Sequence, residues 1–124
     1  MEAEDIREIF RALGPVQIKR MFGGQGVYRD ELMFALVASG ELYLKTDDQS
    51  VDFFRNAGSR PFSYETKDGS KTLTSYWLMP ESALDDPDEA AELGSMAVAA
   101  ARRKAAGKAK NAGKSRKRAS GSAT

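Results

Sequence analysis

Three glycines, Gly23, Gly24 and Gly26, stand within four positions of the stretch RMFGGQGVY, residues 20–28. Glycine-rich turns bind phosphates where they join a strand to a helix, because the free amides at the helix start hold the anion. A dinucleotide-binding loop of the form G-x-G-x-x-G would need a third glycine at position 29, which is Arg29, and the residues that follow favour a strand. We therefore predict that these glycines shape a sharp connection between strands, or a bulge.

The residues around the glycines are predicted to form a structural motif. Gly23 and Gly24 are expected to end one strand, and Gly26 to begin the next or to lie in a bulge, so Gly24→Val should reduce stability. Met21 and Phe22 are expected to be packing residues. The whole motif consists of Arg20, Met21, Phe22, Gly23, Gly24, Gly26 and Tyr28.

Two other patterns suggest ligand chemistry and fail on spacing or context. The stretch AGKS at 112–115 ends like a phosphate loop, but the Walker pattern would need a glycine at the position of Lys108. Five acids near residue 86 are able in principle to bind magnesium, but acids at a helix start also offset the positive end of the helix dipole. We favour the dipole interpretation for Asp85, Asp86, Asp88, Glu89 and Glu92.

The chain contains no histidine and no cysteine. This composition excludes disulfides, zinc sites built from Cys and His, cysteine nucleophiles and Ser-His-Asp triads. Catalysis by two carboxylates, magnesium bound by carboxylates and lysine chemistry are compatible with the composition. We expect a protein that is not an enzyme, with no catalytic residues, no cofactor and no metal site.

Charge is distributed very unevenly along the chain. Residues 101–124 hold nine basic and no acidic residues, which leaves 19 − 9 = 10 basic and 18 acidic residues in 1–100, a net charge of −8. A basic segment on an acidic body attracts polyanions without reading their sequence, so we expect it to contact DNA or RNA. A solvated segment that only aids solubility is the alternative. The candidates are Arg102, Arg103, Lys104, Lys108, Lys110, Lys114, Arg116, Lys117 and Arg118.

Four aromatic residues in the region 61–79 offer a second possible contact surface, namely Phe62, Tyr64, Tyr76 and Trp77. Aromatic rings on a sheet face can stack nucleobases, but packing within or at the edge of a hairpin explains these residues more simply. Tyr76 and Trp77 are adjacent and should point to opposite faces of a strand, which leaves one of them available to a partner.

The elements that must position these residues follow from periodicity and turn signals. Apolar residues at helical spacing predict a helix over 3–13, and acidic capping with Pro87 predicts another over 86–110. Strands are expected at 16–22, at 26–37 with a break at 29–31, and at 38–45, with the run 32–38 central in the sheet. A short helix should run from Asp47 or Asp48 to residue 57, and Asp68-Gly69 indicates a hairpin within 61–79, followed by a helical turn.

This order predicts an α+β fold: a two-layer domain with an antiparallel sheet and helices, in the order α-β(3-4)-α-β(2)-α. We assign residues 1–106 to this domain. The Ala-, Gly-, Lys- and Arg-rich residues 107–124 are expected to form a disordered basic tail.

Three stretches together resemble the N-terminal domain of the TfoX/Sxy competence-regulator family: RMFGGQGVY, FALVASGELYLKTDD and GSRPFSYETKDGSKTLTSYWLMPESALDD. The resemblance covers about residues 6–101. It implies a two-layer α+β domain and a non-enzymatic role, because family members act as coactivators of competence genes beside a DNA-bound catabolite-activator-type regulator. The classical regulators carry a second, helical domain, where this chain has its basic segment. The family supplies no catalytic residues.

We therefore expect a small regulatory protein, a transcriptional coregulator of the competence type. Its folded domain would dock a protein partner, such as a transcription regulator, and its tail would contact nucleic acid. The alternative is a protein-interaction or chaperone-like module with an inert tail. A homodimer is compatible with either. The acidic N-terminus lacks the pattern of a signal peptide, so a cytoplasmic location without membrane contact is expected.

Overall fold

The computed structural model describes residues 1–21 and 23–119, with side chains as far as Gly107. Six strands form one antiparallel sheet, as the sequence predicts, and their order in the sheet is β1-β2-β3-β4-β6-β5. The strands are β1 (Gln17–Met21), β2 (Gly24–Arg29), β3 (Leu32–Ala38), β4 (Glu41–Lys45), β5 (Pro61–Thr66) and β6 (Gly69–Leu78). The helices are α1 (Ala3–Ile9), α2 (Val51–Asn56), α3 (Glu81–Leu84) and α4 (Pro87–Ala119).

Tight turns join most neighbouring strands, which is why the sheet is antiparallel. Asp30 and Glu31 connect β2 to β3 with φ angles of 52° and 67°, and Ser39 and Gly40 connect β3 to β4 with 52° and 76°. Two consecutive residues with positive φ give the turn whose twist matches that of the flanking strands. The predicted break at 29–31 and the predicted central position of 32–38 are both confirmed.

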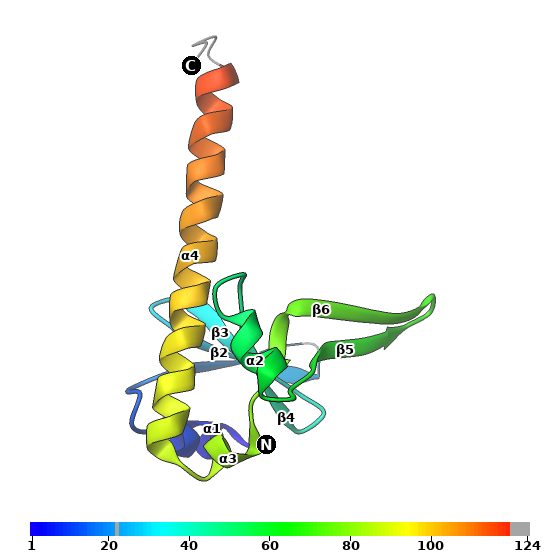
Figure 1. Cartoon of the computed structure of the whole chain (residues 1–124), viewed down its shortest axis with the longest axis vertical. Coiled ribbons are helices and arrows are strands. Elements are labelled where there is room, and N and C mark those ends of the chain that lie inside the picture. The colour runs from blue at the N-terminus through cyan, green and yellow to red at the C-terminus, as the bar shows by residue number, and fades with distance from the viewer. Residues whose placement is uncertain (22, 120–124) are drawn as a thin grey trace.

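The hydrophobic core lies between the sheet and the helices, with α4 crossing the sheet on one face (Figure 1). Phe10, which follows α1, packs edge-on against Phe34 of β3, with ring centroids 5.3 Å apart. A Cβ on Gly94 of α4 would lie 3.0 Å from the side chain of Leu13 and 3.3 Å from that of Phe10. The absence of a side chain at this position therefore lets the N-terminal segment lie directly on α4.

A β-bulge in β3 explains why two consecutive residues face the core. Met33 pairs with Tyr28 and Ala35 pairs with Val27, so Phe34 has no partner on β2. The extra residue lets Phe34 and Ala35 both be fully buried. The strand therefore reads as a nearly continuous apolar run, although the sheet has two distinct faces.

The hairpin β5–β6 leaves the body of the domain and projects to one side (Figure 1). The predicted Asp68-Gly69 turn lies at its tip, where Gly69 has a φ of 110°. The inner end of β6 is buried and its outer part is exposed. Tyr76 and Trp77 are both buried, which agrees with the simpler packing interpretation and leaves neither of them prominently exposed to a partner.

Helix α4 runs farther than the sequence predicts. Its backbone is helical to Ala119, whereas the sequence predicts a helix to residue 110 and a disordered basic tail over 107–124. Alanine, lysine and arginine favour helix, and a helix already nucleated against the core extends at little cost. The division of the chain at residue 106 stays a prediction, and residues 120–124 lie outside the described part. Among the described residues, no helix is long and apolar enough to cross a membrane.

Candidate functional site

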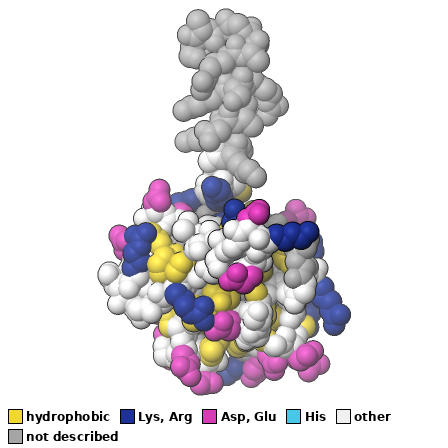
Figure 2. All heavy atoms as spheres, turned by 90° about the vertical axis from the view of Figure 1, so that its right-hand side faces the viewer, with side chains coloured by type: hydrophobic (Ala, Val, Ile, Leu, Met, Phe, Trp, Pro, Cys, Tyr) yellow, Lys and Arg dark blue, Asp and Glu magenta, His cyan; other side chains and the backbone are white. Residues whose placement is uncertain are grey.

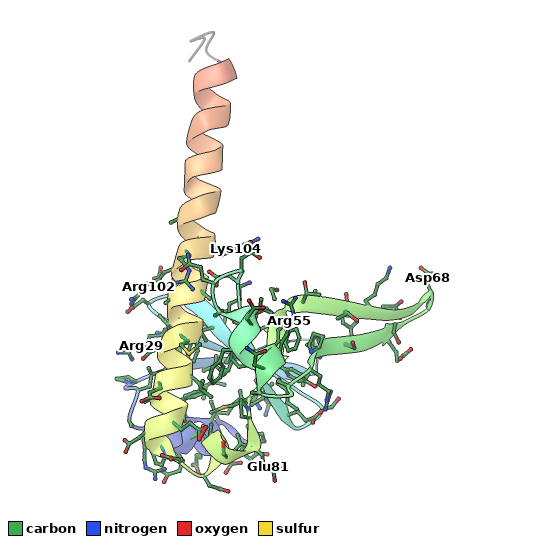
Figure 3. All side chains as sticks on the ribbon, in the orientation of Figure 1. Arg29, Arg55, Asp68, Glu81, Arg102 and Lys104 are labelled. Atoms are coloured by element: carbon green, nitrogen blue, oxygen red, sulfur yellow. The ribbon has the colours of Figure 1, made fainter. Side chains whose placement is uncertain are left out.

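Helix α4 leaves the body of the domain at Arg102, Arg103 and Lys104, the first three of the basic residues singled out in the sequence (Figure 3). Arg102 donates a hydrogen bond to Oδ2 of Asp30 at 2.7 Å, which ties α4 to the turn between β2 and β3. Arg103 binds Asp47 through two contacts, Nε to Oδ2 at 2.5 Å and Nη2 to Oδ1 at 3.0 Å. Two of the nine candidate cations thus already have carboxylate partners in the body.

Asp47 is the better enclosed of the two acidic partners, and its surroundings favour the charged form. The hydrogen bond from Arg103 lowers the pKa of Asp47 to about 2, against the opposing effect of burial. The backbone amide of Gln49 and the hydroxyl of Ser50 also donate to Oδ1 of Asp47. Asp47 therefore organises the turn that leads into α2 and anchors α4 to it.

Lys104 is exposed beside a hollow of about 510 Å³ that lies between α4, the start of α2 and β6. The other six candidates follow on the projecting part of α4, and their side chains lie outside the described residues. They are Lys108, Lys110, Lys114, Arg116, Lys117 and Arg118. The backbone of this segment extends beyond the body of the domain (Figure 1).

The glycine motif connects β1 to β2, and a strand follows it as predicted. Gly23 lies in the turn with a φ of 78°, a value that favours glycine. A Cβ on Gly24, the first residue of β2, would lie only 2.2 Å from the carbonyl oxygen of Val37. Gly26 lies inside β2 rather than at its start, and the bulge is one residue farther on, between Val27 and Tyr28. Gly24 and Gly26 allow close approach of backbone and side chains, and Gly23 allows the positive φ of the turn.

The remaining motif residues have separate positions. Arg20 is exposed on β1, while the Nζ of Lys19 lies 4.7 Å from the ring centroid of Tyr28, across the β1–β2 pair. Phe22, predicted to be a packing residue, lies outside the described residues. The described residues after this turn form β2 from Gly24 onward, where a nucleotide-binding loop would have a helix start.

The acidic cluster near residue 86 performs the predicted structural role at the start of α4. Oδ1 of Asp86 accepts hydrogen bonds from the amides of Asp88 at 3.0 Å and Glu89 at 3.2 Å. This is the geometry of an N-terminal helix cap. Within the described part of the chain, no three acidic side chains come together in an arrangement that would hold a metal ion.

A concave groove on the sheet face opposite α4 is a feature that the sequence analysis missed. It has a volume of about 760 Å³. Strands β1 to β3 line one side and the hairpin β5–β6 lines the other, so the sheet curves around the groove. Tyr64 and Leu73 on the hairpin are 42% and 39% exposed there. Its apolar side chains are Met21, Met33, Leu36, Phe62, Tyr64, Leu73 and Tyr76.

A signal for this groove exists in the alternation of the hairpin. Phe62 and Tyr64 are two residues apart on β5, and Leu73 pairs with Phe62 across the hairpin, so all three share one face. Viewed from the side toward which the hairpin projects, hydrophobic patches interrupt a surface of mixed charge (Figure 2).

A family model described as the TfoX N-terminal domain matches residues 8–101. The chain belongs to the TfoX N-terminal domain family. This match confirms the resemblance. It ends directly before Arg102, so it includes the groove and the glycine motif but none of the nine candidate cations. The chain is also 29% identical to Protein Sxy of Escherichia coli (strain K12) over 76 residues. That match covers 61% of this chain and spans 36% of the length of this curated relative.

Proposed function

We propose that this protein is a non-enzymatic regulatory protein of the competence type. In this proposal the folded domain docks a protein partner, and the projecting part of α4 contacts DNA or RNA without sequence preference. Membership of the TfoX N-terminal domain family and the similarity to Sxy support the regulatory role. The chain spans only about a third of Sxy, so the activity of the longer protein is carried over here as part of the proposal.

The observation that carries the nucleic-acid proposal is the path of α4. Its first turns are held in the core by residues such as Leu93 and Val98, and the same helix then continues beyond the body. Residues 1–100 carry a net charge of −8, which repels a polyanion. Because the helix carries its cations beyond this body, a polyanion can bind the helix while staying away from the acidic surface that repels it. Because Arg102 and Arg103 are paired, we assign the contact chiefly to Lys104 and the six basic residues beyond it.

The test replaces the six basic residues from Lys108 to Arg118 with glutamine, which keeps α4 and both ion pairs of the body intact. Binding of a fluorescently labelled DNA duplex is measured by anisotropy over a range of salt concentrations. If six phosphates are neutralised, the logarithm of affinity falls with the logarithm of salt at a slope of about −0.9 × 6, roughly −5. The substituted chain should lose this slope, while Lys67→Gln at the hairpin tip should keep it.

Equal, salt-sensitive binding by the substituted chain would contradict the role of α4. Docking of a protein partner is tested separately, by cross-linked capture from the native cell with and without nuclease. A partner that is recovered after nuclease treatment supports docking by the folded domain. If the full chain binds no nucleic acid and that partner is still recovered, the interaction module with an inert basic segment is the better description.

A further inference from the structure

Adaptable apolar side chains line the groove. A Cβ on Gly26, at its floor, would lie 2.8 Å from the Sδ of Met33 and 2.9 Å from the Sδ of Met21. Both thioethers therefore lie over Gly26. Methionine is unbranched and polarisable, so it adapts to irregular partner surfaces. Tyr64 and Leu73 add exposed apolar area on the opposite wall, formed by the hairpin.

Lysines lie beside residues of this groove in an otherwise acidic body. Lys71 pairs with Tyr64 across the hairpin and shares its face. The Nζ of Lys45 lies 4.8 Å from the ring centroid of Tyr76, and that of Lys19 lies over Tyr28. Tyr28 is close enough to Tyr76 to contribute to raising its pKa, after the larger effect of burial, so the two cation–ring pairs are neighbours.

Two carboxylates on this side accept hydrogen bonds from neighbouring side chains. Glu65 contributes to the groove lining and accepts a hydrogen bond from Ser70 at 2.6 Å. Glu41 receives two hydrogen bonds from Arg60, at 2.8 and 3.0 Å. The groove therefore presents an apolar floor with Lys19 and Lys71 beside it and one carboxylate, Glu65, in its lining. This is complementary to an apolar surface whose carboxylates face the lysines and lie away from Glu65.

The ring geometry favours a peptide over single-stranded nucleic acid. Phe62 is stacked on Tyr64 at 5.7 Å and meets Tyr43 edge-on at 5.0 Å, so its faces are already used. Nucleobases need exposed ring faces on which to stack, and here aliphatic and thioether side chains outnumber the aromatic ones in the lining.

We propose that the groove docks an acidic, amphipathic segment of a protein partner. The apolar side chains of that segment would pack on Met21, Met33 and Leu73, and its carboxylates would face Lys19 and Lys71. Docking an amphipathic helix in an apolar groove is a common mode of peptide recognition. This inference rests on the proposed partner docking and adds its surface and its chemistry.

The experiment selects peptides from a phage-displayed random library on the immobilised full chain. Selection is counter-screened on a Tyr64→Ser/Leu73→Ser variant, whose changes lie at exposed positions of the hairpin. We expect selected peptides to be rich in Asp and Glu, with apolar residues at helical spacing. In anisotropy measurements, Leu73→Ser and Lys71→Glu should each weaken binding about tenfold or more.

Two matched controls separate the groove from the rest of the surface. Lys67→Glu makes the same charge reversal at the hairpin tip, and Phe53→Ser removes an exposed aromatic ring on α2. Both should leave peptide affinity unchanged. Circular dichroism and thermal unfolding verify that each variant is folded.

Three results would overturn the inference: no enrichment over the counter-screen, enrichment of peptides without acidic residues, or equal binding by the groove variants. Binding of labelled oligothymidine that depends on Lys71 and Leu73 would instead assign the groove to nucleic acid. The chain with six glutamines in α4 should keep full peptide affinity. This result distinguishes failure of the groove inference from failure of the nucleic-acid proposal. If a groove variant still recovers a nuclease-resistant partner, partner docking holds and only the assignment of the groove is wrong.

Discussion

Substitution of Gly24 by alanine is expected to be severely destabilising, for a steric reason that the structure makes quantitative. The added Cβ would lie 2.2 Å from the carbonyl oxygen of Val37, where ordinary contact begins at 3.4 Å. The deficit is 3.4 − 2.2 = 1.2 Å. Relief requires β2 and β3 to separate locally, because a backbone carbonyl held in a ladder cannot turn aside as a side chain can. Overpacking costs about 1–3 kcal/mol and each weakened hydrogen bond about 1 kcal/mol, so we expect a loss of about 3 kcal/mol.

The other two glycines of the motif provide matched controls for the same substitution. A Cβ on Gly26 would meet only the far ends of Met33, Met21 and Tyr28 at 2.8–2.9 Å, which can move, so Gly26→Ala should cost less than about 1 kcal/mol. Gly23 has open space but a φ of 78°, so Gly23→Ala should cost about 1 kcal/mol in backbone strain. Urea unfolding followed by Trp77 fluorescence measures all three.

The order of the three losses is the decisive result. Gly24→Ala should be the most destabilising, with the other two variants well behind. If Gly26→Ala costs as much as Gly24→Ala, or if Gly24→Ala is neutral, the close approach of β2 to β3 is not what requires glycine. Ligand binding by the glycine-rich turn would then become the interpretation to test.

Three further predictions concern charge and capping. Arg103→Gln should lower stability at neutral pH. The depression of the pKa of Asp47 from 3.8 to about 2 corresponds to about 2.4 kcal/mol at most, and screening at a guanidinium that is 38% exposed reduces this to about 1 kcal/mol. Because the folded-state pKa is lowered, this contribution is complete above pH 4 and should vanish as pH falls toward 2, so urea midpoints of the two chains should converge there. Burial, with Tyr28 nearby, raises the pKa of Tyr76 to about 12, so ultraviolet titration of the folded protein should show one tyrosine ionising near that pH, and Tyr76→Phe should remove that step. Asp86→Ala should cost about 1 kcal/mol by uncapping α4, whereas Asp88→Ala should cost less because its backbone amide, not its carboxylate, makes the cap contact.

Local chemistry made the architecture predictable. The Asp68-Gly69 turn, the break at residues 29–31 and the cap at Asp86 each depend on a few adjacent residues, and each lies where the sequence placed it. The sequence predicts too short an α4, because the apolar stripe ends well before the helix does. Alanine and lysine continue a helix without burying anything.

Contacts between distant segments were not predictable from the sequence. Arg103 and Asp47 are 56 residues apart, and Arg102 and Asp30 are 72 apart, so nothing in their spacing shows that two of the candidate cations are paired. The groove was missed for a related reason. Its two walls come from β1–β3 and from the hairpin, and only the curvature of the sheet makes them face each other.

The packing of α4 in the core determines the direction of its projecting end, because both belong to one continuous helix. Each residue of an α-helix turns the chain by about 100° and advances it by about 1.5 Å. One residue inserted after Gly107 would therefore rotate every later position by more than a quarter turn, whereas seven would nearly restore the original angle. The packing of α4 on the body thus fixes the direction in which each residue of the projecting end points. Binding by a partner that recognises this direction should depend on how many residues are inserted, whereas binding by a partner that responds only to charge should not.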